Sequence, residues 1–176
     1  PYTGNTWFLF YNKSIFSAND VKHLNTMLDK GKVTFPLTNS WYLPAFYFAG
    51  GCTMFGADGT DAEAGIDFHS EKGITVTRYL AELVRHPNFV IDQDGIGVQM
   101  LKDGTAGAAF SGSWEAESIR QRLGADFGAA QLPTVTIDGK NGQLRSFAGS
   151  KALGVNPESK NTEAALALAA FLGNRE

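Results

Sequence analysis

The sequence has a single cysteine and no long hydrophobic run. Cys52 cannot form an internal disulfide, and no cluster of cysteine and histidine accompanies it, so we predict a small buried hydrophobic side chain. No apolar stretch approaches the roughly 20 residues that span a bilayer, and the longest, 164–172, suits a core helix. The sequence contains no signal peptide, and we expect both of its ends to be cuts within a larger protein.

The chain also has no basic region. It carries 15 Lys and Arg against 18 Asp and Glu, which gives a formal net charge of -3. The basic residues are scattered along the chain, whereas a nucleic-acid binder needs them clustered on one face. We therefore predict that nucleic acid is not a partner.

Motifs for catalysis, cofactors and metals are missing as well. The chain has no G-x-S-x-G turn, no P-loop and no dinucleotide fingerprint, and none of its three histidines lies four residues from another. The acidic groups around Asp58 and around Asp92 and Asp94 do not have the spacing of a calcium loop, so we interpret them as surface turns. We predict a protein that is not an enzyme and that holds no metal and no cofactor.

What the sequence does contain is an alternation of strand-like and helical segments over 176 residues. This alternation predicts a single α/β domain over 1–176, in which helices cover a sheet. Capping residues bound several helices, among them Ser17 and Ser113 at helix starts and Gly124 at a helix end. Asp58-Gly59 predicts a hairpin over 55–66, and 138–142 is expected to be a loop. The predicted strands are 7–11, 33–37, 106–110, 127–132 and 147–155, and the predicted helices are 43–49, 70–86, 96–101, 114–123 and 162–172, with a further helix after Ser17.

Aromatic residues follow predicted strands at loops and helix starts. Trp41 and Tyr42 lie in a loop that leads into a helix, and Trp114 lies at another helix start, whereas Trp7 lies within an apolar strand and is expected in the core. Ligands of open α/β sheets bind at the carboxyl ends of strands. Aromatic rings there suit a pyranose, whose C–H faces stack on a ring while its hydroxyls need polar partners. Candidates for those polar partners are Asn5, Thr6, Asn39 and Ser40.

The order of these segments resembles the extracellular solute-binding proteins of the maltose/maltodextrin family, the receptors of ABC sugar importers. The resemblance rests on several short motifs in the right order, including Tyr-Asn-Lys at 11–13, Gly-Gly at 50–51 and Gly-x-Trp at 112–114. The matching segments are 1–13, 35–51, 55–67, 104–114, 131–133 and 147–149.

The resemblance implies a periplasmic-binding-protein-like fold of two α/β lobes that close on a sugar, of which this chain covers most of the second lobe. It implies an oligosaccharide ligand, a membrane permease as partner, a monomer, and a location outside the cell or in the periplasm, at the cell envelope. Trp114 matches the family's stacking tryptophan, Trp41 and Tyr42 fall in its aromatic sugar loop, and Asn5 falls near a polar contact.

Two departures leave the identity of the sugar open. Asn5 stands where some maltodextrin binders have an acidic residue, and 39–42 reads Asn-Ser-Trp-Tyr in place of Glu-Pro-Tyr-Phe. The alternatives are another solute, such as an amino acid or a polyamine, and a small glycosidase-like α/β enzyme. An anionic solute would call for an arginine at the site, for which Arg145 remains a candidate.

Overall fold

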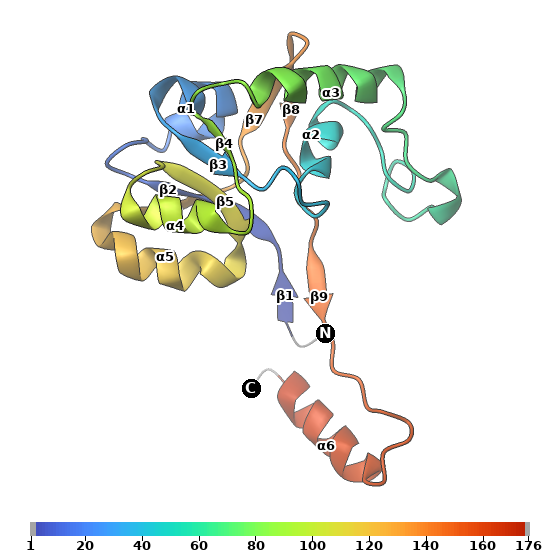
Figure 1. Ribbon diagram of the computed structural model, residues 1–176. Helices are drawn as coiled ribbons and strands as arrows, with labels where there is room; N and C mark the ends of the chain where they lie inside the picture. The colour runs from blue at the N-terminus through green and yellow to red at the C-terminus, as the bar shows by residue number, and fades with distance from the viewer. Residues whose placement is uncertain (1–2, 175–176) are drawn as a thin grey trace. The chain divides into compact units, whose positions relative to one another are not determined.

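The computed structural model describes residues 3–174 and divides the chain into two compact units. The larger unit is Trp7–Phe147, and the smaller one combines the N-terminal six residues with the segment from Ala148 onward. Pro1 and Tyr2, which belong to the first matching segment, lie outside the described residues. Each unit is described by itself below (Figure 1).

The larger unit is built on a five-stranded sheet with the order β4-β3-β5-β2-β6. Strand β3 runs parallel to both β4 and β5, whereas β2 is antiparallel to β5 and β6. The three parallel strands therefore bring their carboxyl ends to one edge of the sheet. The strands are β2 (Trp7–Asn12), β3 (Val33–Phe35), β4 (Phe89–Ile91), β5 (Ala108–Gly112) and β6 (Phe127–Ala130).

Helices cover both faces of this sheet (Figure 1). Side chains alternate along β2, so that Leu9 joins the larger core on one face and Phe10 joins a smaller core on the other. The smaller core lies under α4 and α5, and the larger core receives side chains from α1, α2 and α3. The helices are α1 (Leu24–Lys30), α2 (Pro44–Ala49), α3 (Glu71–Leu83), α4 (Ile96–Asp103) and α5 (Ala116–Leu123), with 3-10 turns η1 (Asp20–Lys22), η2 (Ala62–Ala64), η3 (Ser113–Glu115) and η4 (Gly124–Asp126).

The α/β class is confirmed, and so are the burial of Trp7 and Cys52, which are 1% and 5% exposed. The reciprocal bonds of the capping sequence form at Ser17, because the Asp20 amide donates to Ser17 Oγ and the Ser17 amide donates to the Asp20 carboxylate. The 3-10 turn η1 follows them, however, and α1 begins only at Leu24. Ser113 does not cap a helix by its side chain. It begins the turn η3, and α5 starts three residues later.

Two turn predictions were wrong. The segment 55–66 forms no strands, and one bridge between Met54 and Ile66 closes it, because its residues are mostly exposed and have no core face to bury. The segment expected to be a loop is a hairpin of β7 (Thr134–Ile137) and β8 (Lys140–Gln143). Its two-residue turn has positive φ at Asp138 and Gly139, 49° and 72°, which matches the twist of a hairpin.

The smaller unit consists of an antiparallel strand pair and one helix. Strand β1 (Thr3–Asn5) pairs with β9 (Gly149–Lys151), and α6 (Thr162–Gly173) follows. Large apolar side chains of α6 are exposed, Phe171 most of all at 76%. None of the helices among residues 3–174 is both long and apolar enough to cross a membrane.

Candidate functional site

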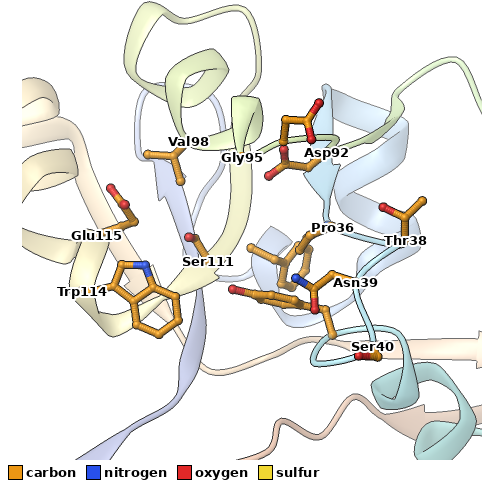
Figure 2. A pocket seen from close by; sticks show the side chains of 13 residues that line it. Pro36, Thr38, Asn39, Ser40, Asp92, Gly95, Val98, Ser111, Trp114 and Glu115 are labelled. Carbon is orange, nitrogen blue, oxygen red and sulfur yellow. The ribbon is translucent and has the colours of Figure 1, made fainter.

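A polar cavity of about 700 Å³ lies at the carboxyl ends of β3, β4 and β5 (Figure 2). The loop after β3 forms one side, the residues after β4 form a second, and the end of β5 with the turn η3 forms a third. This is the edge of an α/β sheet at which ligands bind. The lining residues are Pro36, Thr38, Asn39, Ser40, Tyr42, Asp92, Asp94, Gly95, Val98, Phe110, Ser111, Trp114 and Glu115.

Trp114 presents its indole at this cavity and is 56% exposed. The ring lies against the backbone of Gly112, where a Cβ would come within 2.1 to 2.2 Å of three indole carbons. Gly112 has φ -73° and ψ 158°, which any residue adopts, so the close approach of the ring is what requires glycine there. The glycine thus lets the indole lie down on the strand end and leaves the rest of it open to a ligand.

Tyr42 forms part of the cavity wall and is only 7% exposed. Its ring centroid lies 4.9 Å from that of Trp7, which anchors it on the core. Burial raises the pKa of Tyr42, the negative charges of Asp92 and Glu115 raise it further, and a hydrogen bond with Ser111 acts in the opposite direction. The phenol therefore stays protonated and is available for hydrogen bonding at neutral pH.

The loop between β3 and α2 is held by the backbone and side chain of Asn39. Asn39 Oδ1 accepts from the Trp41 amide at 2.8 Å, and the Asn39 carbonyl accepts from the amides of Tyr42 and Leu43. The side-chain bond forms an Asx turn and the backbone bonds close the turn that follows, so the loop is fixed with Asn39 and Ser40 lining the cavity.

The other three predicted site residues are not among the residues that line the cavity. Trp41 is half-buried and packs against Phe147, with ring centroids 5.3 Å apart, and it is not among the residues that line the cavity. Asn5 ends β1 and pairs with Gly149, and Thr6 follows it in the smaller unit. The cavity therefore brings together Asn39, Ser40, Tyr42 and Trp114 from the set that the sequence predicted.

The whole chain, residues 1–176, matches the family described as bacterial extracellular solute-binding proteins. The chain belongs to this family. It is 31% identical to the galactooligosaccharide-binding protein of Bacillus subtilis (strain 168), an alignment that covers 100% of this chain and 45% of the relative. This family is one of solute-binding proteins, and the sequence analysis likewise expected a binding protein.

Solved structures agree with this family. A structure described with acarbose is 53% identical, with a TM-score of 0.93 over 98% of this chain and 46% of that one. A maltodextrin-binding protein from L. casei BL23, solved without ligand, is 29% identical, with a TM-score of 0.83 over 97% and 46%. The periplasmic-binding-protein-like fold is thereby confirmed, and the chain spans about half the length of these relatives.

Sequence reasoning missed several residues of this cavity, above all Asp92. The interpretation of Asp92 as part of a surface turn was wrong, because the residue directly follows β4 and is 6% exposed, whereas Asp94 is exposed. Ser111, near the end of β5, and Glu115, in the turn η3, also line the cavity and were not predicted. The missed signal was a position directly after a strand, but β4 has only three residues and was not recognised.

A second hollow of about 500 Å³ lies among Phe48, Phe55 and Phe147, beside Cys52. Arg145 lines this hollow and does not line the polar cavity. Burial raises the pKa of the Cys52 thiol, which keeps it protonated and weakly reactive. Among residues 3–174, no group of three His, Cys, Asp or Glu side chains is placed to hold a metal ion.

Proposed function

We propose that this chain supplies one wall of an oligosaccharide site in the substrate-binding component of an ABC importer. The observation that carries the proposal is Trp114, whose indole lies more than half exposed beside a polar cavity at the carboxyl ends of three parallel strands. A sugar ring stacks its C–H face on such an indole, while its hydroxyls reach polar side chains. Maltodextrin or a related oligosaccharide is the proposed ligand, in keeping with the galactooligosaccharide, acarbose and maltodextrin named for the relatives.

Polar groups beside Trp114 support the same ligand. Asn39, Ser40 and Tyr42 offer amide and hydroxyl groups that both donate and accept, as sugar hydroxyls require. We also propose contacts from Asn5, Thr6 and Trp41, the remaining residues for which a ligand role is predicted.

The side chains that line the cavity do not favour an anionic solute, such as an amino acid bound through its carboxylate. No Lys, Arg or His is among the lining residues, and Arg145 belongs to the other hollow. A buried carboxylate of a ligand would have no cation to pair with.

The same proposal gives residues 1–176 the place of most of the second lobe of a two-lobe protein. Ligand would favour a closed state of the two lobes through contacts that are better in that state, and the closed form would dock on a membrane permease. We propose that the protein acts as a monomer at the cell envelope, either outside the cell or in the periplasm.

The test is calorimetric titration of the full-length protein with maltotetraose, together with Trp114→Ala. We expect saturable binding that weakens at least about tenfold in the variant, because an aromatic anchor of a binding site contributes ~2 kcal/mol or more. Phe171→Ala, which removes an exposed aromatic side chain of α6, is the matched control and should bind as the wild type does. Failure to bind maltotetraose and galactooligosaccharides, with a response to an amino acid or a polyamine, would overturn the sugar proposal.

A further inference from the structure

Asp92 is a buried carboxylate with an unsatisfied oxygen. Its Oδ1 is shielded from solvent and has no hydrogen-bond partner, and none of the ion pairs among residues 3–174 includes this residue. The close approach of β3 and α4 holds it in place, since a Cβ on Gly97 would come within 2.5 Å of both Asp92 Oδ2 and Thr34 Oγ1. A buried charge without a partner is costly, so a missing partner is expected.

Although its Oδ1 is shielded from solvent, Asp92 as a residue lines the cavity, so a cationic group of a ligand there can balance the charge of the carboxylate. Among the described residues that line the cavity are two further carboxylates, Asp94 and Glu115, and no basic side chain. Glu115 has internal partners, because Lys102 Nζ lies 3.8 Å from its Oε2 and Ser118 Oγ donates to the same oxygen at 2.9 Å. Asp94 is exposed, so water solvates its charge. Asp92 is the buried one of the three, and none of the ion pairs described for residues 3–174 offsets its charge.

The negative field extends across the cavity. The charges of Asp92 and Glu115 add to burial in raising the pKa of Tyr42, which lies in the loop between β3 and α2. Tyr42, Asp94 and Glu115 are the other titratable groups that line the cavity, and Thr34 and Gly97, which pack against Asp92, do not titrate. A low local dielectric strengthens this field for any ligand that excludes water.

We propose that the cavity selects, among oligosaccharides, those that carry a basic amine, and that Asp92 is the counter-ion of the protonated amine. The inference rests on the proposed function and names the ligand class more closely. A sugar hydroxyl can donate a hydrogen bond to Asp92 but leaves its charge unbalanced, whereas an ammonium group donates and balances the charge together. Charge-assisted hydrogen bonds are the stronger class, so an amine in this position gains affinity over a hydroxyl or a glycosidic oxygen.

Acarbose and maltotetraose make a suitable pair of probes, because they are of equal length and acarbose carries one secondary amine. In calorimetric titrations of the full-length protein, we expect acarbose to bind about tenfold more tightly at about pH 6. Above the pKa of the free amine, binding should take up a proton, so the affinity for acarbose should fall toward about pH 8 while that for maltotetraose stays level. Proton uptake is measured by repeating the titration in buffers of different ionisation enthalpy.

Asp92→Asn keeps the shape of the side chain and removes its charge. We expect it to abolish both the preference for acarbose and the proton uptake. Asp94→Asn is the matched control at an exposed carboxylate of the same cavity, and it should retain most of the preference, since solvent screens that charge. Circular dichroism checks that both variants fold. If Asp92→Asn does not fold, the proton uptake that accompanies acarbose binding to the wild type still tests the proposal.

The outcomes separate the two proposals. Binding of neither compound would overturn the proposed function itself. Equal affinity for the two compounds, no proton uptake, or a preference that survives Asp92→Asn would overturn the counter-ion role of Asp92 while sugar binding stands.

Discussion

Asp20 and Asp92 are the two buried carboxylates of residues 3–174, 7% and 6% exposed, and their surroundings are opposite. Asp20 lies at the start of η1 and has a partner for each oxygen: Oδ1 accepts from Lys30 Nζ at 2.7 Å, and Oδ2 accepts from the amide and hydroxyl of Ser17. Asp92 lies at the end of β4, beside the cavity, with Oδ1 unpartnered. A carboxylate satisfied within the chain serves the fold, and one left unsatisfied beside a cavity points to a ligand.

The largest effect on binding is expected from Gly112→Ala, because Gly112 underlies Trp114, which lines the same cavity as Asp92. The new Cβ would overlap the indole of Trp114, so the ring must leave its place, and we expect affinity for maltotetraose to fall at least about tenfold. Stability should change by less than ~1 kcal/mol, because alanine adopts this backbone conformation without strain. Calorimetric titration and thermal unfolding measure the two effects.

Gly154→Ala is the control for that substitution, because nothing lies within 4 Å of its added Cβ. It should leave affinity unchanged. Unaltered affinity in a folded Gly112→Ala protein would mean that the position of the indole does not matter for binding.

At Asp20 we expect the reverse pattern, a loss of stability without a loss of affinity. Asp20→Asn removes a charge that Lys30 and Ser17 stabilise, and it should lower Tm by several degrees. Lys30→Met leaves the bonds from Ser17 in place and should lower Tm by less. A weaker affinity for maltotetraose in either variant would contradict the view that Asp20 serves the fold and not the ligand.

Lowering the pH should produce a smaller loss of stability, because it protonates the same Asp20 carboxylate. The hydrogen bond from Lys30, followed by those from Ser17, lowers the pKa of Asp20 from 3.8 to about 2. Because the folded-state pKa is depressed, the contribution is complete above about pH 4 and is lost as pH falls toward about 2. The difference in Tm between wild type and Asp20→Asn should therefore narrow over this interval, and a difference that persists at the acid end would contradict the assignment.

The smallest expected effect is that of Asp92→Asn on stability. Removing an unpaired buried charge should leave the free energy of unfolding unchanged or raise it by about 1 kcal/mol. Denaturant unfolding measures this change, with Asp94→Asn as reference. A clear loss of stability would show that Asp92 serves the fold, as Asp20 does.

Some features that depend on neighbours in the chain were predicted well, whereas the helix cap at Ser113 and the hairpin over 55–66 were not. The reciprocal bonds at Ser17 and the glycine that ends α5 act within a turn of helix, so local chemistry is enough to place them. The short strand β4 and the β7–β8 hairpin were not recognised. Three residues carry little periodicity, and the hairpin owes its stability to packing on the larger core.

The sequence by itself determined the α/β class, the family resemblance and four of the residues that line the cavity, because alternation of apolar segments and the order of short motifs are properties of the chain. Only the tertiary structure decided which aromatics face the cavity. Trp41 and Trp114 both follow strands, yet Trp41 packs on Phe147 and Trp114 lies over Gly112. The tertiary structure also buried Asp92 beside that cavity, since burial and hydrogen bonding depend on strands and helices that are distant in sequence.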